Sequence, residues 1–167
     1  MQSTLINKLR FFTALLLFSI ISSCSTSPEF TTTQVDKTLT PQRVIAEPDN
    51  SLNKIALWGG TILDTRNLEN STQIEILGYP LDSSHRPLLD KKPLGRFIVL
   101  HNGYLEPATY SQGELLSVLG SIGVNQKGKI GEKLYTYPVI KAEKLHLWSA
   151  SDGRSNTRFH IGIGIRL

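Results

Sequence analysis

Short runs of alternating apolar and polar residues recur along this chain from residue 54 onward, where no long stretch has helical periodicity. Side chains of a strand alternate between two faces, so such runs predict strands with one buried face. Strands are expected over residues 54–64, 73–81, 96–101, 114–124, 132–140 and 145–148. Because short turns join them, the chain predicts an all-β fold that is mainly antiparallel.

The first of these strands, residues 54–64, is long and is interrupted by Gly59 and Gly60. Paired glycines inside a strand are typical of a sharp bend or a β-bulge. A long bent strand can pair on both sides of a small closed barrel, and closure removes the exposed strand edges. We therefore expect a small OB-like barrel, with a β-sandwich as the alternative.

Short elements are expected at the borders of this barrel. Thr40 can cap a helix that has Pro41 at its first position, and Pro48-Asp49-Asn50 is expected to end it. Residues 125–129 are polar, contain a glycine, and are expected to form a turn. In residues 159–167 every odd position is large and apolar, which predicts a final strand packed on the core.

The amino terminus has the order of a secretory signal: Lys8 and Arg10, an apolar run over residues 11–21, then small residues. This run is too short for a helix that spans a bilayer, which needs about 20 residues. Ile21-Ser22-Ser23-Cys24 resembles the lipobox of bacterial lipoproteins, which is cleaved before the cysteine. We expect cleavage between Ser23 and Cys24 and acylation of Cys24; an ordinary signal peptide with a free Cys24 is the alternative.

The lipobox resemblance implies three acyl chains on Cys24, which is more than the two signals that stable anchoring needs. Ser25 follows, not the aspartate that commonly retains such lipoproteins in the inner membrane, so the expected location is the outer membrane of a Gram-negative cell. Residues 24–40 are rich in serine and threonine and predict a flexible tether. The chain thus divides into a signal peptide over residues 1–23, this tether, and one domain over residues 41–167.

Charge and cysteine content exclude several classes of function. The formal net charge is +4, and it falls to +2 once Lys8 and Arg10 leave with the signal peptide. That is too little for a nucleic-acid partner, which needs a concentrated basic stripe. Cys24 is the only cysteine, and the four histidines lack zinc-hydrolase spacing. No serine lies in a G-x-S-x-G turn. We expect no catalytic residue, no metal site and no cofactor.

Aromatic side chains are the strongest candidates for a binding surface, because an OB-like barrel can present rings on which sugars or bases stack. Trp58 and Trp148 lie on predicted strands, and we assign them to the core. Tyr104 and Tyr110 lie in a loop beside glycine and proline. They are the expected exposed pair and the candidate ligand-binding residues.

Several short motifs follow one another in order between residues 40 and 148. They include Trp58-Gly59-Gly60, Tyr79-Pro80-Leu81-Asp82, Asn102-Gly103-Tyr104-Leu105-Glu106-Pro107, Tyr135-Thr136-Tyr137-Pro138 and His146-Leu147-Trp148. In this order they resemble the Slp family of starvation-inducible bacterial outer-membrane lipoproteins. No motif after Trp148 is matched.

The resemblance implies a lipoprotein that is held in outer-membrane lipid through acylated Cys24, contacts other envelope components, and acts in stress or starvation. It brings no established reaction. We therefore expect a non-catalytic accessory or structural module of the envelope. A periplasmic module that binds a small molecule or a glycan through an exposed aromatic surface is the alternative.

Overall fold

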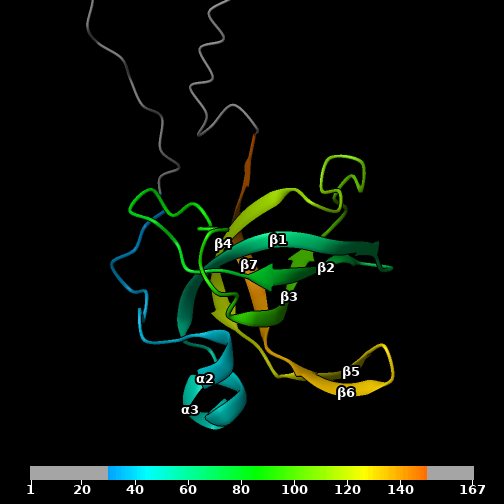
Figure 1. Ribbon diagram of the computed structural model, residues 1–167. Coiled ribbons are helices and arrows are strands. Elements are labelled where there is room, and N and C mark those ends of the chain that lie inside the picture. Colours follow the sequence, from blue (N-terminus) through cyan, green and yellow to red (C-terminus); the bar gives the residue numbers. More distant parts are fainter. Residues whose placement is uncertain (1–29, 150–167) are drawn as a thin grey trace, which may run out of the picture.

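The computed structural model describes residues 30–149, and its strands form a closed five-stranded barrel (Figure 1). The barrel strands are β1 (Ile55–Asn67), β2 (Ser71–Gly78), β3 (Gly95–Asn102), β4 (Leu115–Ile122) and β7 (Val139–Trp148). Around the barrel their order is β1, β2, β3, β7, β4. Only the β3–β7 pair is parallel among these described strands. The expected all-β, mainly antiparallel, OB-like barrel is confirmed.

β1 closes the barrel because it pairs on both sides. Its residues 55–61 pair with β4, and its residues 60–67 pair with β2. Gly60 belongs to both ladders, and a Cβ atom there would overlap the carbonyl oxygen of Leu77 in β2. The register with β2 shifts at residues 62–64, which marks a bulge and adds bend to the strand. The glycine-interrupted first strand therefore serves two neighbours, as predicted.

Apolar side chains from all five barrel strands fill the interior, and two neighbouring segments add to this core. From the barrel come Ala56, Trp58, Ile62, Ile74, Ile76, Phe97, Val99, Leu116, Val118, Ile122 and Ile140. Val44 of α2 (Pro41–Ala46) is fully buried in the same cluster. Leu105 and Tyr110, from the connection between β3 and β4, pack against it. Both tryptophans are 5% exposed, so their assignment to the interior is confirmed.

The helix before β1 begins as predicted. The Thr40 hydroxyl accepts a hydrogen bond from the backbone N–H of Arg43 at 3.2 Å, and Pro41 follows the cap. The helix also ends before Pro48-Asp49-Asn50, as predicted, with Ala46 as its last residue, but Pro48 does not start a loop. It begins a second short helix, α3 (Pro48–Ser51), because a proline fits the first position of a helix, where no N–H donor is needed.

The expected turn over residues 125–129 is wrong. These residues lie mostly in β5 (Gln126–Ile130), which pairs with β6 (Lys133–Tyr137) as a separate two-stranded sheet. The chain turns instead at Gly131, whose φ of 58° suits glycine. Pro138 then separates β6 from β7, since proline has no N–H to donate to a ladder. The short strand expected over residues 145–148 is the end of β7.

The β5–β6 hairpin projects from the barrel at the lower right of Figure 1. Tyr135 and Tyr137 on its inner face pack with Ile98 of β3. The Tyr137 hydroxyl donates to Glu75 Oε1 at 3.3 Å, and the same oxygen accepts from Arg96 Nη1 at 2.8 Å. The hairpin is thus fastened to the outer surface of β2 and β3.

Residues 30–40 lie against the barrel, so this part of the predicted tether is not a free linker. Phe30 and Leu39 are each 6% exposed. The indole Nε1–H of Trp58 donates to the carbonyl oxygen of Leu39 at 2.8 Å. These two buried side chains and this hydrogen bond hold an otherwise polar segment against the barrel. Residues 24–29 of the tether, the signal peptide over 1–23 and the strand predicted over 159–167 lie outside the described residues.

Candidate ligand-binding site

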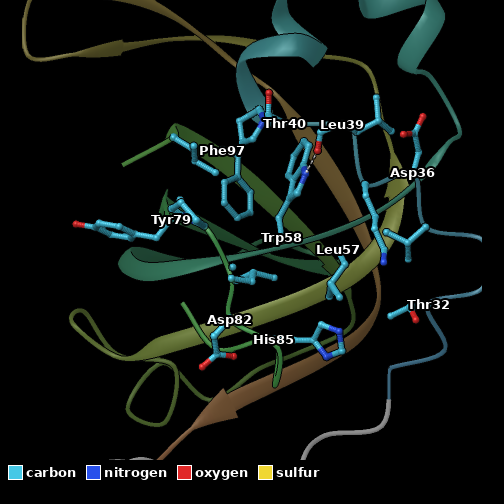
Figure 2. Close-up of a pocket in the computed structure, with 18 of the residues that line it drawn as sticks. Thr32, Asp36, Leu39, Thr40, Leu57, Trp58, Tyr79, Asp82, His85 and Phe97 are labelled. Atoms are coloured by element: carbon cyan, nitrogen blue, oxygen red, sulfur yellow. Dashed lines mark hydrogen bonds between the residues drawn. The ribbon is translucent and has the colours of Figure 1, made fainter. Parts of the chain in front are cut away.

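A pocket of about 560 Å³ lies against the barrel, between the N-terminal segment (residues 30–41) and the β2–β3 loop (residues 79–94) (Figure 2). The two walls and the barrel each contribute lining residues. Among them are Thr32, Asp36 and Leu39 from the N-terminal segment, Leu81, Asp82 and His85 from the β2–β3 loop, and Leu57, Trp58 and Phe97 from the barrel. Segments about fifty residues apart in the chain therefore form one site.

The floor of the pocket is apolar and tightly packed. The rings of Trp58 and Phe97 meet edge to face, with centroids 5.1 Å apart. Gly59 lies beside them, and a Cβ atom there would come within 2.8 Å of the Leu116 carbonyl oxygen and 2.9 Å of Leu81 Cδ2. The absence of a side chain at this position lets the β2–β3 loop lie directly on β1.

Hydrogen bonds hold the N-terminal segment as one wall. The Asp36 N–H donates to the carbonyl oxygen of Ile55 at 3.0 Å, which ties the segment to β1. Asp36 Oδ1 accepts from the Thr38 N–H at 2.9 Å and from the Thr38 hydroxyl at 2.6 Å. Lys54 Nζ lies 3.8 Å from the other carboxylate oxygen. The Asp36 side chain thus fixes a local turn in the wall.

The β2–β3 loop is held in a similar way by Asp82. Its Oδ1 accepts from the Ser84 N–H at 2.8 Å, from the Ser84 hydroxyl at 2.7 Å and from the Arg86 N–H at 2.9 Å. His85 has a φ of 69° at the tip of this turn. The Ser117 hydroxyl of β4 donates to the His85 carbonyl oxygen at 2.6 Å. The second wall is therefore also fastened to the barrel.

The two acidic side chains of the pocket are kept in their charged forms. Hydrogen bonds from the side chain and backbone of Thr38 lower the pKa of Asp36. Partial burial acts to raise the pKa of Asp82, but hydrogen bonds from Ser84 and Arg86 outweigh it, and the pKa is lowered. Both carboxylates serve as acceptors in turns at neutral pH.

The two tyrosines predicted to bind a ligand lie away from this pocket. Tyr104 is 66% exposed, and its hydroxyl donates to Glu106 Oε2 at 2.7 Å. Tyr110 is half-buried and packs against the core, because its loop folds back onto the barrel. The structure therefore does not bring them together as an exposed pair. A ligand-binding role for either residue stays a prediction.

Other predicted site residues fall outside the described part of the chain. Ser23 and Cys24, at the expected cleavage and lipid attachment site, precede it. Within residues 30–149, no three or more His, Cys, Asp or Glu side chains are grouped to hold a metal ion. No helix in the same range is long and apolar enough to cross a membrane.

The first wall is not apparent from the sequence, because residues 30–40 are mostly polar and such a composition predicts a tether. Two signals were available. Phe30 and Leu39 are large apolar residues at the two ends of the stretch, and Asp36 stands two residues before Thr38, a spacing typical of a side-chain-capped turn. Asp82 and Ser84 repeat that spacing in the second wall.

Three curated proteins resemble this chain. An uncharacterized protein of Haemophilus influenzae is 39% identical over 99 residues, which is 59% of this chain and 54% of the relative. The uncharacterized lipoprotein YeaY of Escherichia coli is 32% identical over 133 residues, 77% of this chain and 67% of its own length. Outer membrane protein Slp of Escherichia coli is 26% identical over 102 residues, 61% of this chain and 54% of that protein. The chain thus spans about half the length of two relatives and two thirds of the third.

Two solved structures are similar at low sequence identity. One is a small single-stranded DNA-binding protein from Streptomyces coelicolor, with 14% identity, a TM-score of 0.33, and coverage of 56% of this chain and 93% of that chain. The other is the Plasmodium falciparum SSB in complex with ssDNA, with 17% identity, a TM-score of 0.31, and coverage of 58% and 93%. Likeness at this level says nothing about what this chain binds.

A sequence model of one family covers most of the chain. The model of the outer membrane lipoprotein Slp family matches residues 21–162, so it includes the cysteine region and continues past Trp148, where the recognised motifs end. Its description also gives the location, the outer membrane. This chain is an envelope lipoprotein of the outer membrane and belongs to the Slp family.

Proposed function

We propose that this lipoprotein is a non-catalytic accessory module that binds a small amphiphilic ligand in the pocket between the N-terminal segment and the β2–β3 loop. The observation that carries the proposal is the pocket itself, with about 560 Å³ of space lined by the partly buried Leu57 and Leu81 and backed by the core rings of Trp58 and Phe97. Small-molecule sites have this size and place polar groups beside apolar surface to orient the ligand. Polar and apolar atoms line this pocket in about equal share, which suits an amphiphilic ligand. Asp36 and Asp82 are polar groups of this kind.

The construction of the walls also favours binding. Each wall is fixed by hydrogen bonds of its own, from Thr38 to Asp36 and from Ser84 to Asp82. A site that is already formed spends less free energy on ordering when a ligand enters. The pocket therefore has the pre-organisation of a binding site.

The same hydrogen bonds favour binding over catalysis. A general acid or base must exchange a proton near the working pH. Asp36 and Asp82 instead accept several hydrogen bonds from their own turns, which lower the pKa of each carboxyl group. Their role is to hold the backbone of the two walls.

The anchor is the second part of the proposed function. We propose that the signal peptide is cleaved after Ser23 and that Cys24 carries the lipid; the proposal is supported by the resemblance of Ile21-Ser22-Ser23-Cys24 to a lipobox. Replacing Cys24 with alanine should abolish labelling by radioactive palmitate. Labelling that persists in this variant would exclude the anchor. Contact with other envelope components and a stress or starvation role belong to the same proposal and rest on the family resemblance.

The pocket is tested with N-phenyl-1-naphthylamine, a neutral apolar dye whose fluorescence rises in apolar sites. The full chain should bind the dye, and Leu57→Trp should weaken binding at least tenfold because the larger ring occupies the floor. The dye is excited directly, so the new indole does not disturb the measurement.

Leu89→Trp is the matched control, since Leu89 lies in the same β2–β3 loop, is 52% exposed and does not line the pocket. This variant should bind the dye as the unchanged chain does. Equal affinities for the unchanged chain and for Leu57→Trp would overturn the proposed function.

A further inference from the structure

The pocket lies close to the point where the lipid joins the chain. The proposed anchor, Cys24, precedes Phe30 by six residues, and six residues of fully extended chain span only about 20 Å. Phe30 is fixed on the barrel, where its ring meets the imidazole of His85 edge to face at 5.6 Å. The side of the barrel that carries these two residues therefore stays within about 20 Å of the lipidated residue.

That side of the barrel is also the side with the pocket. His85 lines the pocket, and Thr32, only two residues after Phe30, lines it as well. The bilayer is thus the nearest reservoir of apolar ligands for the floor of Leu57, Trp58 and Phe97. A single acyl chain matches that floor, since burial of each methylene group favours binding.

Charges of both signs line the mouth of the pocket, which we define by Asp36, Lys37 and Asp82. Asp36 and Lys37 lie in the first wall, and Lys54 Nζ is 3.8 Å from Asp36 Oδ2. In the second wall Asp82 accepts a hydrogen bond from the backbone of Arg86.

Arg86 does not add a charge to this mouth, because its side chain does not line the pocket. Its guanidinium lies 5.3 Å from the ring centroid of Trp148. Its Nη1 atom is buried, and within residues 30–149 no group accepts a hydrogen bond from it. The mouth of the pocket thus combines the carboxylates of Asp36 and Asp82, which suit an ammonium group, with the ammonium of Lys37, which suits a phosphate. A zwitterionic head group has both.

We propose that the pocket holds a single-chain zwitterionic amphiphile drawn from the bilayer, with its acyl chain on the Trp58 floor and its head group among the charges of the mouth. This inference rests on the proposed function. It adds the class of ligand and the place from which the ligand enters.

The class of ligand is tested by displacement of N-phenyl-1-naphthylamine from the full chain. Four competitors share a twelve-carbon tail and differ in the head: dodecylphosphocholine, dodecanoate, dodecyltrimethylammonium and dodecyl maltoside, each used below its micelle concentration. Dodecylphosphocholine should displace half of the dye at a concentration at least tenfold lower than the singly charged competitors need. Equal concentrations for all four would overturn the inference.

Charge variants test whether charged side chains at the mouth of the pocket bind the head group. Lys37→Gln removes one cation from the mouth at an exposed side chain; it should reduce the advantage of dodecylphosphocholine at least threefold and leave displacement by dodecyl maltoside unchanged. Lys92→Gln, a change at an exposed residue of the β2–β3 loop that does not line the pocket, should alter neither. Loss of displacement by dodecyl maltoside as well would mean that Lys37→Gln distorts the pocket, and the head-group assignment would fail.

Two failures remain distinguishable. If Leu57→Trp weakens dye binding but the four amphiphiles compete equally, the inference is wrong and the proposed function stands. If Leu57→Trp has no effect on dye binding, the proposed function itself is wrong.

The source of the ligand is tested on the lipoprotein extracted from membranes. Native mass spectrometry should find a bound zwitterionic lysophospholipid that is lost from Leu57→Trp; a bound two-chain phospholipid would contradict the single-chain assignment. If the acyl chains on Cys24 fill the pocket instead, the acylated protein will not bind the dye whereas Cys24→Ala will. That outcome would overturn the bilayer as the source.

Discussion

The N-terminal segment and the β5–β6 hairpin are both additions to the same barrel, and they are attached in different ways. The hairpin is attached through large side chains: the rings of Tyr135 and Tyr137 meet edge to face at 4.8 Å and pack with Ile98. The N-terminal segment is attached through the buried side chains at its two ends, Phe30 and Leu39. Between them it is held by backbone groups, such as the Asp36 N–H that donates to Ile55. The first arrangement buries Tyr137 and Ile98 to 5% exposure each, and the second borders a pocket of about 560 Å³.

The difference shows how a small barrel can keep an open site. Protein interiors are packed to the density of organic crystals, so an addition held by apolar side chains fills the space beneath it. Backbone hydrogen bonds fix a wall without requiring that the space beside it be filled. An open pocket next to a closed core is therefore possible where the walls are held by turns such as those of Asp36 and Asp82.

Truncation of the central ring on each side should give the largest effects. Trp58→Ala removes a core ring, the floor of the pocket and the hydrogen bond to Leu39, and should lower the free energy of unfolding by about 3–5 kcal/mol. Tyr137→Ala should lower it by only about 1–2 kcal/mol, because the hairpin can separate while the barrel stays closed. Urea unfolding followed by circular dichroism measures both.

The order of these two losses is the informative result. A loss for Tyr137→Ala as large as that for Trp58→Ala would show that the hairpin is part of the cooperative core. The hairpin would then unfold together with the barrel and would not be a separable addition to it.

Added methyl groups test the same contrast with a smaller effect. At Gly59 a Cβ atom would come within 2.8 Å of the Leu116 carbonyl oxygen, which is fixed in the barrel, so Gly59→Ala should cost about 1–3 kcal/mol and weaken dye binding by moving the β2–β3 loop. At Gly128 the nearest atom is Tyr137 Cε2 at 2.9 Å, the far part of a side chain that can shift. Gly128→Ala should therefore cost less than about 1 kcal/mol.

Dye affinity separates the two glycines further. Gly128→Ala should bind N-phenyl-1-naphthylamine as the unchanged chain does, because the hairpin does not line the pocket. Weaker dye binding in Gly128→Ala than in Gly59→Ala would contradict the separation of the two regions.

Local patterns were sufficient to predict the barrel but not the pocket. Alternation of apolar residues, paired glycines in β1 and the Thr40-Pro41 cap each report on a few neighbouring residues, and each was confirmed. The pocket depends on Asp36 and Asp82 lying on opposite walls, and no local pattern relates two residues that are so far apart. Tyr110 shows the same limit, since its burial depends on a loop that folds back onto the core.

The hairpin shows why the sequence predicts a turn over residues 125–129 although the chain turns at Gly131. Gly128 and Gly131 stand in similar polar surroundings, so the sequence does not show which of them turns the chain. In the structure the ring of Tyr137 lies over Gly128, where a Cβ atom would meet Cε2 at 2.9 Å, while Gly131 takes a positive φ. The difference depends on a side chain nine residues away from Gly128.

Acid and alkali should act on the two regions separately, with the smallest effects of the three tests. Hydrogen bonds from Thr38 lower the pKa of Asp36 below its ordinary value of 3.8, and those from Ser84 and Arg86 do so for Asp82 in spite of its partial burial. A lowered pKa in the folded state adds stability that is present above pH 3.8 and is lost as the pH falls through the folded value. Both walls of the pocket should therefore loosen in acid.

The β5–β6 hairpin should lose stability at alkaline pH. Burial raises the pKa of Tyr137 above its ordinary value of 10.0, and the Glu75 carboxylate raises it further, although Arg96 opposes this. A raised pKa adds stability that is present below pH 10.0 and is lost as the pH rises through the folded value. The hairpin should thus loosen in alkali, after ordinary tyrosines have begun to ionise.

Nuclear magnetic resonance separates these events residue by residue. The amide signals of Thr38 and Ser84 should move below pH 3.8, and the ring signals of Tyr137 above pH 10.0. Asp36→Asn should remove the step at Thr38 and leave the step at Ser84, because each amide reports on the carboxylate to which it donates. If the Ser84 step also disappeared, the two walls would be coupled through the pocket and would have to be treated as one unit that opens together.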